Sequence, residues 1–89
     1  MSIREELWEF PHAMQLKVMG AADAPLEEVL VEILETHLGS FDRALNLSRK
    51  PSAKGTFVSI TANILVHDKQ QVEGIYRDLN ASPHVKITL

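Results

Sequence analysis

The stretch Lys50-Pro51-Ser52-Ala53-Lys54-Gly55-Thr56-Phe57-Val58-Ser59-Ile60-Thr61-Ala62-Asn63-Ile64 joins a turn to a strand whose side chains alternate between apolar and polar. Proline, serine and glycine between Pro51 and Gly55 are typical of a tight turn. The alternation after Phe57 predicts that one face of the strand is buried and the other exposed. Such a strand fits the centre of an antiparallel sheet that helices cover on one face only. The use of the uncovered face is therefore the main functional question.

Alternation of the same kind predicts three further strands. The inward-facing residues are expected to be Met14, Leu16 and Val18 in a strand from Ala13 to Met19, Leu45 and Leu47 in a strand from Arg43 to Arg49, and Val85, Ile87 and Leu89 in the last strand. The second and third of the four strands are joined by the proline-glycine turn and are expected to be antiparallel.

Two helices are predicted between these strands. The first follows Gly20, with Asp23 or Ala24 as its cap, Pro25 in its first turn and Gly39 as its stop. Its apolar stripe is formed by Leu26, Val29, Leu30, Ile33, Leu34 and Leu38. The second helix begins at Asp68-Lys69-Gln70-Gln71, which has the pattern of a capping box, and is expected to bury Val72, Ile75, Tyr76 and Leu79. Gly74 lies inside it, and close approach of the other helix would explain a glycine there.

The order strand, helix, strand, strand, helix, strand predicts an α+β domain with the ferredoxin-like βαββαβ fold. Right-handed crossovers would place both helices on one face of a four-stranded antiparallel sheet with the first and third strands central. We expect residues 1–12 to form an N-terminal arm and residues 13–89 a single ferredoxin-like domain. Trp8 and Phe10 are the large apolar residues near the end of that arm.

Composition narrows the possible functions. The chain has 89 residues, no cysteine and a net charge of −3, so thiolate chemistry is excluded and binding to nucleic acid is disfavoured. The sequence shows neither a signal peptide nor an apolar membrane segment, and we expect a cytoplasmic protein. The four histidines lack the spacing of a chelating motif, and no nucleophile has a suitably spaced base. We therefore expect no enzyme activity, no metal and no cofactor.

Several motifs together are more specific than the fold. Glu9-Phe10-Pro11, Lys17-Val18-Met19-Gly20, Lys50-Pro51-Ser52-Ala53-Lys54-Gly55-Thr56-Phe57 and Ser59-Ile60-Thr61 resemble the pattern of the YbeD-like family of small uncharacterised bacterial proteins. The resemblance covers nearly the whole chain. It implies a ferredoxin-like fold similar to ACT regulatory domains, and it implies no catalytic residue.

The first functional hypothesis is regulation or interaction by protein contact, with an unknown partner or in a homodimer. Several large apolar residues, Val31, Phe41 and Leu65 among them, have no obvious place inside the domain. The expected polar face combines Gln15, Lys17, Asn46, Ser48, Phe57, Ser59, Thr61, Asn63, Lys86 and Thr88. The candidate interaction surface is Trp8, Phe10, Lys17, Lys54, Phe57, Ser59, Thr61 and Asn63.

Two alternatives remain open. An ACT-like domain would bind a small molecule such as an amino acid at the loop after the first strand, where Gly20, Asp23 and Pro25 are the candidates. Leu26 stands where that class has a glycine that lets a ligand approach the backbone. An RNA-binding sheet would need stacking aromatics on both central strands, and Lys54-Gly55-Thr56-Phe57-Val58 supplies one ring.

Overall fold

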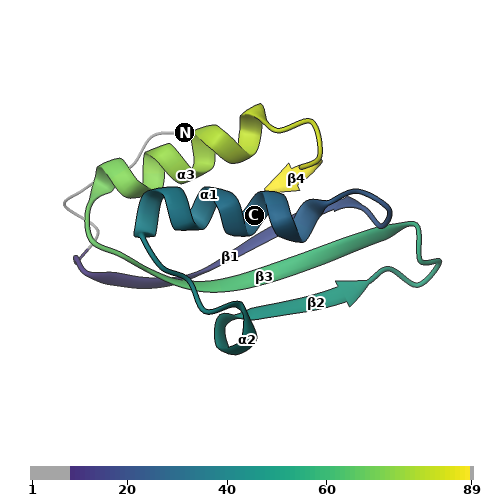
Figure 1. The fold of residues 1–89 in the computed structure, drawn as a ribbon, viewed down its shortest axis with the longest axis horizontal. Coiled ribbons are helices and arrows are strands. Elements are labelled where there is room, and N and C mark those ends of the chain that lie inside the picture. The colour runs from purple at the N-terminus through teal and green to yellow at the C-terminus, as the bar shows by residue number, and fades with distance from the viewer. Residues whose placement is uncertain (1–8, 89) are drawn as a thin grey trace.

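The computed structural model describes residues 9–88. Its elements are β1 (His12–Ala21), α1 (Leu26–Leu38), α2 (Arg43–Asn46), β2 (Leu47–Pro51), β3 (Phe57–Val66), α3 (Lys69–Ala81) and β4 (Ile87–Thr88). The strands form one sheet in the order β2-β3-β1-β4, and every neighbouring pair is antiparallel. Helices α1 and α3 lie side by side over one face of this sheet (Figure 1). The predicted α+β ferredoxin-like fold is confirmed, with the short helix α2 as an addition.

The core lies between the sheet and the two long helices. The alternation predicted for β3 is confirmed, because Val58, Ile60, Ala62, Ile64 and Val66 are all buried. They pack with Leu16 and Val18 of β1, with Leu26, Leu30 and Leu34 of α1, and with Val72, Ile75 and Leu79 of α3. Val31 was expected to lie outside the apolar stripe, but it is 3% exposed. That expectation was wrong because the buried face of α1 is wider than the stripe of Leu26, Leu30 and Leu34.

The second strand begins later than expected. Residues Arg43–Asn46 form helix α2, and β2 runs only from Leu47 to Pro51. The Asp42 carboxylate accepts hydrogen bonds from the backbone N–H groups of Ala44 and Leu45 and so caps this helical turn. Leu47 packs against the core as predicted, whereas Leu45 is 80% exposed. The prediction that Leu45 faces inward was therefore wrong, because a local cap overrode the alternating pattern.

The last strand has the opposite register to the one expected. Thr88 pairs with the buried Val18, and Ile87 pairs with Met19 on the other face. Residues directly opposite each other on antiparallel strands lie on the same face, so Thr88 faces the helices and Ile87 does not. A turn in which Val85 N–H donates to the Ser82 carbonyl precedes the strand and shifts its alternation. Val85 still packs against the core, and Leu89 lies outside the described residues.

The α1–α3 contact explains Gly74. A Cβ atom placed on Gly74 would lie 2.6 Å from Cε1 of His37, so the imidazole ring of α1 packs directly over the backbone of α3. The predicted close approach is thus confirmed. Within residues 9–88, no helix has both the length and the apolar character needed to cross a membrane.

Candidate functional site

The face of the sheet turned away from α1 and α3 is uncovered, and we call it the open face (Figure 1). The strand register assigns its residues, because cross-strand partners share a face. They are Gln15, Lys17 and Met19 of β1, Ser48 and Lys50 of β2, Phe57, Ser59, Thr61, Asn63 and Leu65 of β3, and Ile87 of β4. The centre of this face is polar, and its large apolar side chains are at the two ends.

One end of the open face carries an apolar hollow. Met19 pairs with Ile87 on one side and with Ser59 on the other, and Phe57 lies two residues from Ser59 along β3. Phe57 is 44% exposed and Ile87 is 48% exposed. A depression of about 370 Å³ lies between Met19, Phe57 and the Lys50–Ser52 segment of the hairpin. This apolar hollow can receive one side chain of a partner.

The hairpin that borders the apolar hollow is held rigidly by its turn. Gly55 has φ +72°, a conformation that glycine adopts without steric cost, and its N–H donates to the Ser52 carbonyl. The Ser52 N–H donates to the Phe57 carbonyl, and the Phe57 N–H donates to Oγ of Ser52. These bonds hold the backbone of Phe57 against the turn that contains Ser52 and Gly55. The motif Pro51 to Gly55 therefore positions part of the open face.

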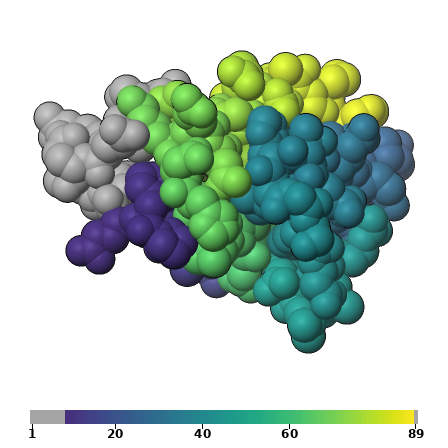
Figure 2. All heavy atoms as spheres, turned by 60° about the vertical axis from the view of Figure 1, so that its left-hand side comes forward, coloured from purple at the N-terminus to yellow at the C-terminus, as the bar shows by residue number. Residues whose placement is uncertain are grey.

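A groove of about 600 Å³ lies at the other end of the sheet. It exists because α2 replaces the first residues predicted for β2, so β3 has no β2 partner beyond Ala62. Figure 2 shows this end of the molecule, with the purple start of β1 beside α3 and the teal segment that contains α2 projecting at the lower edge. The groove combines apolar Leu38, Phe41 and Leu65 with the amides of Gln15 and Asn63. Phe41 packs partly on the core, so the expectation that it points to solvent was wrong, whereas Leu65 is exposed.

The loop between β1 and α1 has few groups left for a ligand. A Cβ atom on Gly20 would clash with the His84 carbonyl oxygen, so the chain itself occupies the space beside this glycine. The Ala22 and Ala24 N–H groups donate to the carbonyls of Thr56 and Ala21. Pro25 is the N-cap of α1 without a side-chain cap bond, so the predicted capping by Asp23 was wrong.

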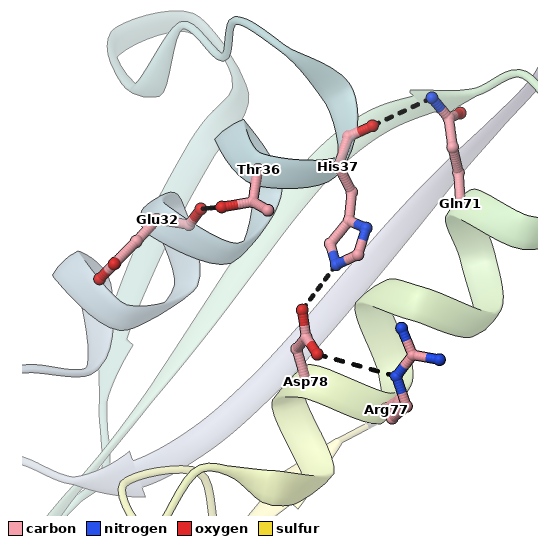
Figure 3. A network of polar contacts seen from close by, with 6 residues as sticks. All are labelled: Glu32, Thr36, His37, Gln71, Arg77 and Asp78. Atoms are coloured by element: carbon pink, nitrogen blue, oxygen red, sulfur yellow. Dashed lines mark hydrogen bonds and ion pairs between the residues drawn. The ribbon is translucent and has the colours of Figure 1, made fainter.

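A polar network joins α1 to α3 on the covered face (Figure 3). Nε2 of His37 lies 2.6 Å from Oδ2 of Asp78, and the Gln71 amide donates to the His37 carbonyl. Gln71 also accepts from the His67 N–H while its own N–H donates to Asp68, so the predicted capping box is present in a form displaced by one residue. Thr36, which precedes His37 in α1, donates its hydroxyl hydrogen bond to the Glu32 carbonyl (Figure 3). The network holds the two helices together.

Other chemistry is limited in the described part of the chain. No cluster of three or more His, Asp or Glu side chains with the geometry of a metal site occurs there. Burial raises the pKa of the Tyr76 phenol above its ordinary value of 10.0. This group faces the core rather than the open face.

The structure brings together part of the candidate interaction surface that the sequence predicts. Lys17, Phe57, Ser59, Thr61 and Asn63 all lie on the open face, with Lys54 in the adjoining turn. Phe10 instead packs against the core, and Trp8 lies outside the described residues. Thr88 and Lys86 were expected on this face, but the shifted register turns Thr88 toward the helices.

Three open-face residues were missed. Met19 is the last residue of the strand predicted from Ala13 to Met19, and its face follows from the alternation of Gln15 and Lys17. Lys50 could have been found by extending the predicted second strand by one residue. Ile87 could not be found, because the turn at Ser82–Val85 sets the register of β4.

Comparisons with known proteins cover almost the entire chain. A family model described as "Protein of unknown function (DUF493)" matches residues 5–89. A UPF0250 protein of Shewanella sediminis is 41% identical over 96% of this chain and 93% of its own length, and one of Neisseria gonorrhoeae is 33% identical over 97% and 93%. The solution structure of protein HP0495 from H. pylori superimposes with a TM-score of 0.65 at 18% identity, covering 92% of this chain and 85% of that one. The structural likeness supports the fold alone.

Proposed function

The chain belongs to the UPF0250 (DUF493) family of proteins of unknown function, the family that includes YbeD, and we propose that its domain is a non-catalytic protein-interaction module that acts through the open face. The proposal keeps the cytoplasmic location and regulatory role expected from the sequence. It leaves open at this stage whether the partner is another protein or a second copy of the chain.

One observation carries the proposal. The open face keeps the large apolar side chains of Phe57, Ile87 and Leu65 close to half exposed. Phe57 and Met19 line the apolar hollow, and Ile87 pairs with Met19 on the neighbouring strand. Exposed apolar residues that gather around a depression and are rimmed by polar side chains are typical of protein contact surfaces.

Sensing of an amino acid has less support. The loop with Gly20, Asp23 and Pro25 uses its Ala22 and Ala24 amides internally, and the His84 carbonyl fills the space beside Gly20. A ligand at that loop would have to displace contacts within the chain. A rise in melting temperature with a free amino acid would favour this alternative over protein contact.

Site-specific photo-crosslinking tests the proposal directly. The chain has no cysteine, so Ser48→Cys places a single benzophenone label on an exposed open-face position of the edge strand β2, opposite Thr61. Glu32→Cys on the exposed side of α1 is the matched control. We expect the Ser48 label, and not the Glu32 label, to form an adduct of defined mass in a bacterial lysate.

The adduct must then be reproduced with a purified protein. The partner identified by mass spectrometry, or a second copy of the chain, should protect amides of β1 and β3 from hydrogen exchange when mixed with the unlabelled domain. Identical adducts from both labels, or no adduct together with a strictly monomeric domain in light scattering, would contradict the proposal.

A further inference from the structure

Charge is sharply divided between the two layers of the domain. The four strands and the β2–β3 turn contain no aspartate or glutamate. They carry Lys17, Arg49, Lys50 and Lys54, and Lys86 immediately precedes β4. The carboxylates of the described elements belong to the helices and their caps: Glu27, Glu28, Glu32, Glu35, Asp42, Asp68, Glu73 and Asp78. The sheet layer is therefore positively charged although the net charge of the chain is −3.

Ion pairing follows the same division. Within residues 9–88, the lysines and arginines outside the sheet layer have carboxylate neighbours, with Arg43 3.2 Å from Glu27, Lys69 3.8 Å from Glu73 and Arg77 3.9 Å from Asp78. Among residues 9–88, none of the sheet-layer cations forms an ion pair. Their charge is available to a partner without breaking a contact within the chain.

Two of these cations flank the apolar hollow. Lys50 pairs with Ser59, which pairs with Met19, while Lys17 lies two residues from Met19 along β1. Two interstrand spacings and a two-residue rise place the Cα atoms of Lys17 and Lys50 about 12 Å apart. Ser59 lies between Met19 and Lys50, and Lys54 lies in the turn beyond Phe57. Positive charge that has no ion pair in the described chain thus borders the apolar hollow at Lys50 and lies beside Met19 at Lys17.

We infer that the open face binds an acidic segment of another protein, one that inserts an apolar side chain into the apolar hollow and places carboxylates beside Lys17 and Lys50. The inference rests on the proposed function and specifies the partner. Charge complementarity makes the open face select an acidic segment and speeds the association of the two proteins. Burial of the segment's apolar side chain against Phe57 and Met19 then stabilises the complex.

A second copy fits this site less well. Its α1 offers the exposed carboxylates of Glu28, Glu32 and Glu35. The exposed large apolar residues of the described chain are Leu45, Phe57, Leu65 and Ile87, and none belongs to α1. That helix therefore has charge but no group that could fill the apolar hollow.

Nucleic acid also fits less well, although the face is positive. Single-stranded RNA is bound on such sheets by stacking bases on aromatic rings of both central strands. Among residues 9–88, Phe57 is the one aromatic ring on the open face, and β1 presents Gln15, Lys17 and Met19 there.

A peptide titration tests the inference. The probe is the labelled peptide EELLEELLEELL, and its matched control is KKLLKKLLKKLL; fluorescence anisotropy with the full chain reports binding. We expect the acidic peptide alone to bind, and to bind more weakly as salt is raised. Lys17→Glu combined with Lys50→Glu should weaken binding at least about tenfold, since two favourable charge contacts become repulsive. Phe57→Ala should weaken binding separately, with circular dichroism confirming that each variant is folded.

Arg77→Glu provides the control, because Arg77 is 76% exposed on α3 and its reversal should leave affinity unchanged. Equal binding of the two peptides, or equal loss in Arg77→Glu and in the sheet variants, would overturn the inference. So would preferential binding of oligouridylate, or self-association that the sheet variants abolish. If crosslinking from Ser48→Cys yields a validated partner that lacks acidic segments, the inference fails and the proposed function stands. If no partner is found either, both fail.

Discussion

His37 and Asp78 lie 41 positions apart in the sequence, and their 2.6 Å contact joins α1 to α3 on the covered side of the sheet. The ring reaches Asp78 because it passes over Gly74, where any side chain would occupy its place. A glycine inside one helix and a histidine near the end of another thus set the distance between the two helices.

The first prediction concerns Gly74. Replacement of a helical glycine by alanine ordinarily stabilises by about 1 kcal/mol, but at this position the new Cβ would lie 2.6 Å from the His37 ring. We expect Gly74→Ala to lower the free energy of unfolding by about 1–3 kcal/mol, measured by urea denaturation. The double variant with His37→Ala should regain part of that loss. A Gly74→Ala protein more stable than the parent would show that the helices have room to separate.

The second prediction compares two neighbours on β3. Ile60 is fully buried, whereas Thr61 lies on the open face opposite Lys17. Ile60→Asp should unfold the domain, because an unpaired buried carboxylate costs several kcal/mol. Thr61→Asp introduces the same side chain one position away and should leave the far-ultraviolet circular dichroism unchanged. Equal behaviour of the two variants would contradict the assignment of the faces of β3.

The sequence predicted those features in which several local signals agree. In β3 the alternation, the preceding turn and the following cap at Asp68 all indicate the same boundaries, and the structure has them at Phe57 and Val66. The role of Gly74 could be predicted because glycine destabilises the interior of a helix and is expected there where a neighbouring helix packs closely. The open-face residues of β3 followed from the same alternation, so the centre of the candidate site could be predicted.

The errors arose where a short-range hydrogen bond competes with alternation. Asp42 caps a single helical turn and exposes Leu45, although the Leu45–Leu47 spacing is that of a strand. The Ser82–Val85 turn shifts β4 by one position, and such a shift reverses every side chain of a strand. The place of Ile87 on the open face, beside Met19, could therefore not be predicted from the sequence pattern. The separation of charge between the sheet layer and the helices could have been predicted from the strand assignments alone. It was missed because the low net charge does not reveal it.

The third prediction tests the α2 assignment. Leu45 is 80% exposed and Leu47 packs against the core. Leu45→Ala should change the free energy of unfolding by less than about 0.5 kcal/mol, whereas Leu47→Ala should cost about 1–2 kcal/mol because it removes partly buried apolar surface. Urea denaturation of both variants checks this difference. Similar losses in both would favour the longer strand expected from the sequence.

The fourth prediction concerns alkaline pH. Burial raises the pKa of the Tyr76 phenol above 10.0, so the folded state binds more protons than the unfolded state once the pH passes that value. The stabilising contribution is complete below the unfolded pKa and is lost as the pH rises through the folded pKa. Tyr76 is the one tyrosine of the chain, so phenolate absorbance reports it alone. The titration midpoint should be higher in buffer than in urea, and Tyr76→Phe should weaken the fall of stability with alkaline pH.

The last prediction uses the register of β4. Thr88 pairs with the buried Val18, and its Oγ1 is buried without a hydrogen-bond partner among the described residues. A buried hydroxyl that lacks a partner costs about 1–3 kcal/mol, and valine has nearly the same shape without the oxygen. Thr88→Val should therefore raise the free energy of unfolding by about 1 kcal/mol, while Ile87→Thr on the exposed face should change it little. Had β4 the register first expected, Ile87→Thr would cost more than Thr88→Val gains, and thermal unfolding of the two variants distinguishes the registers.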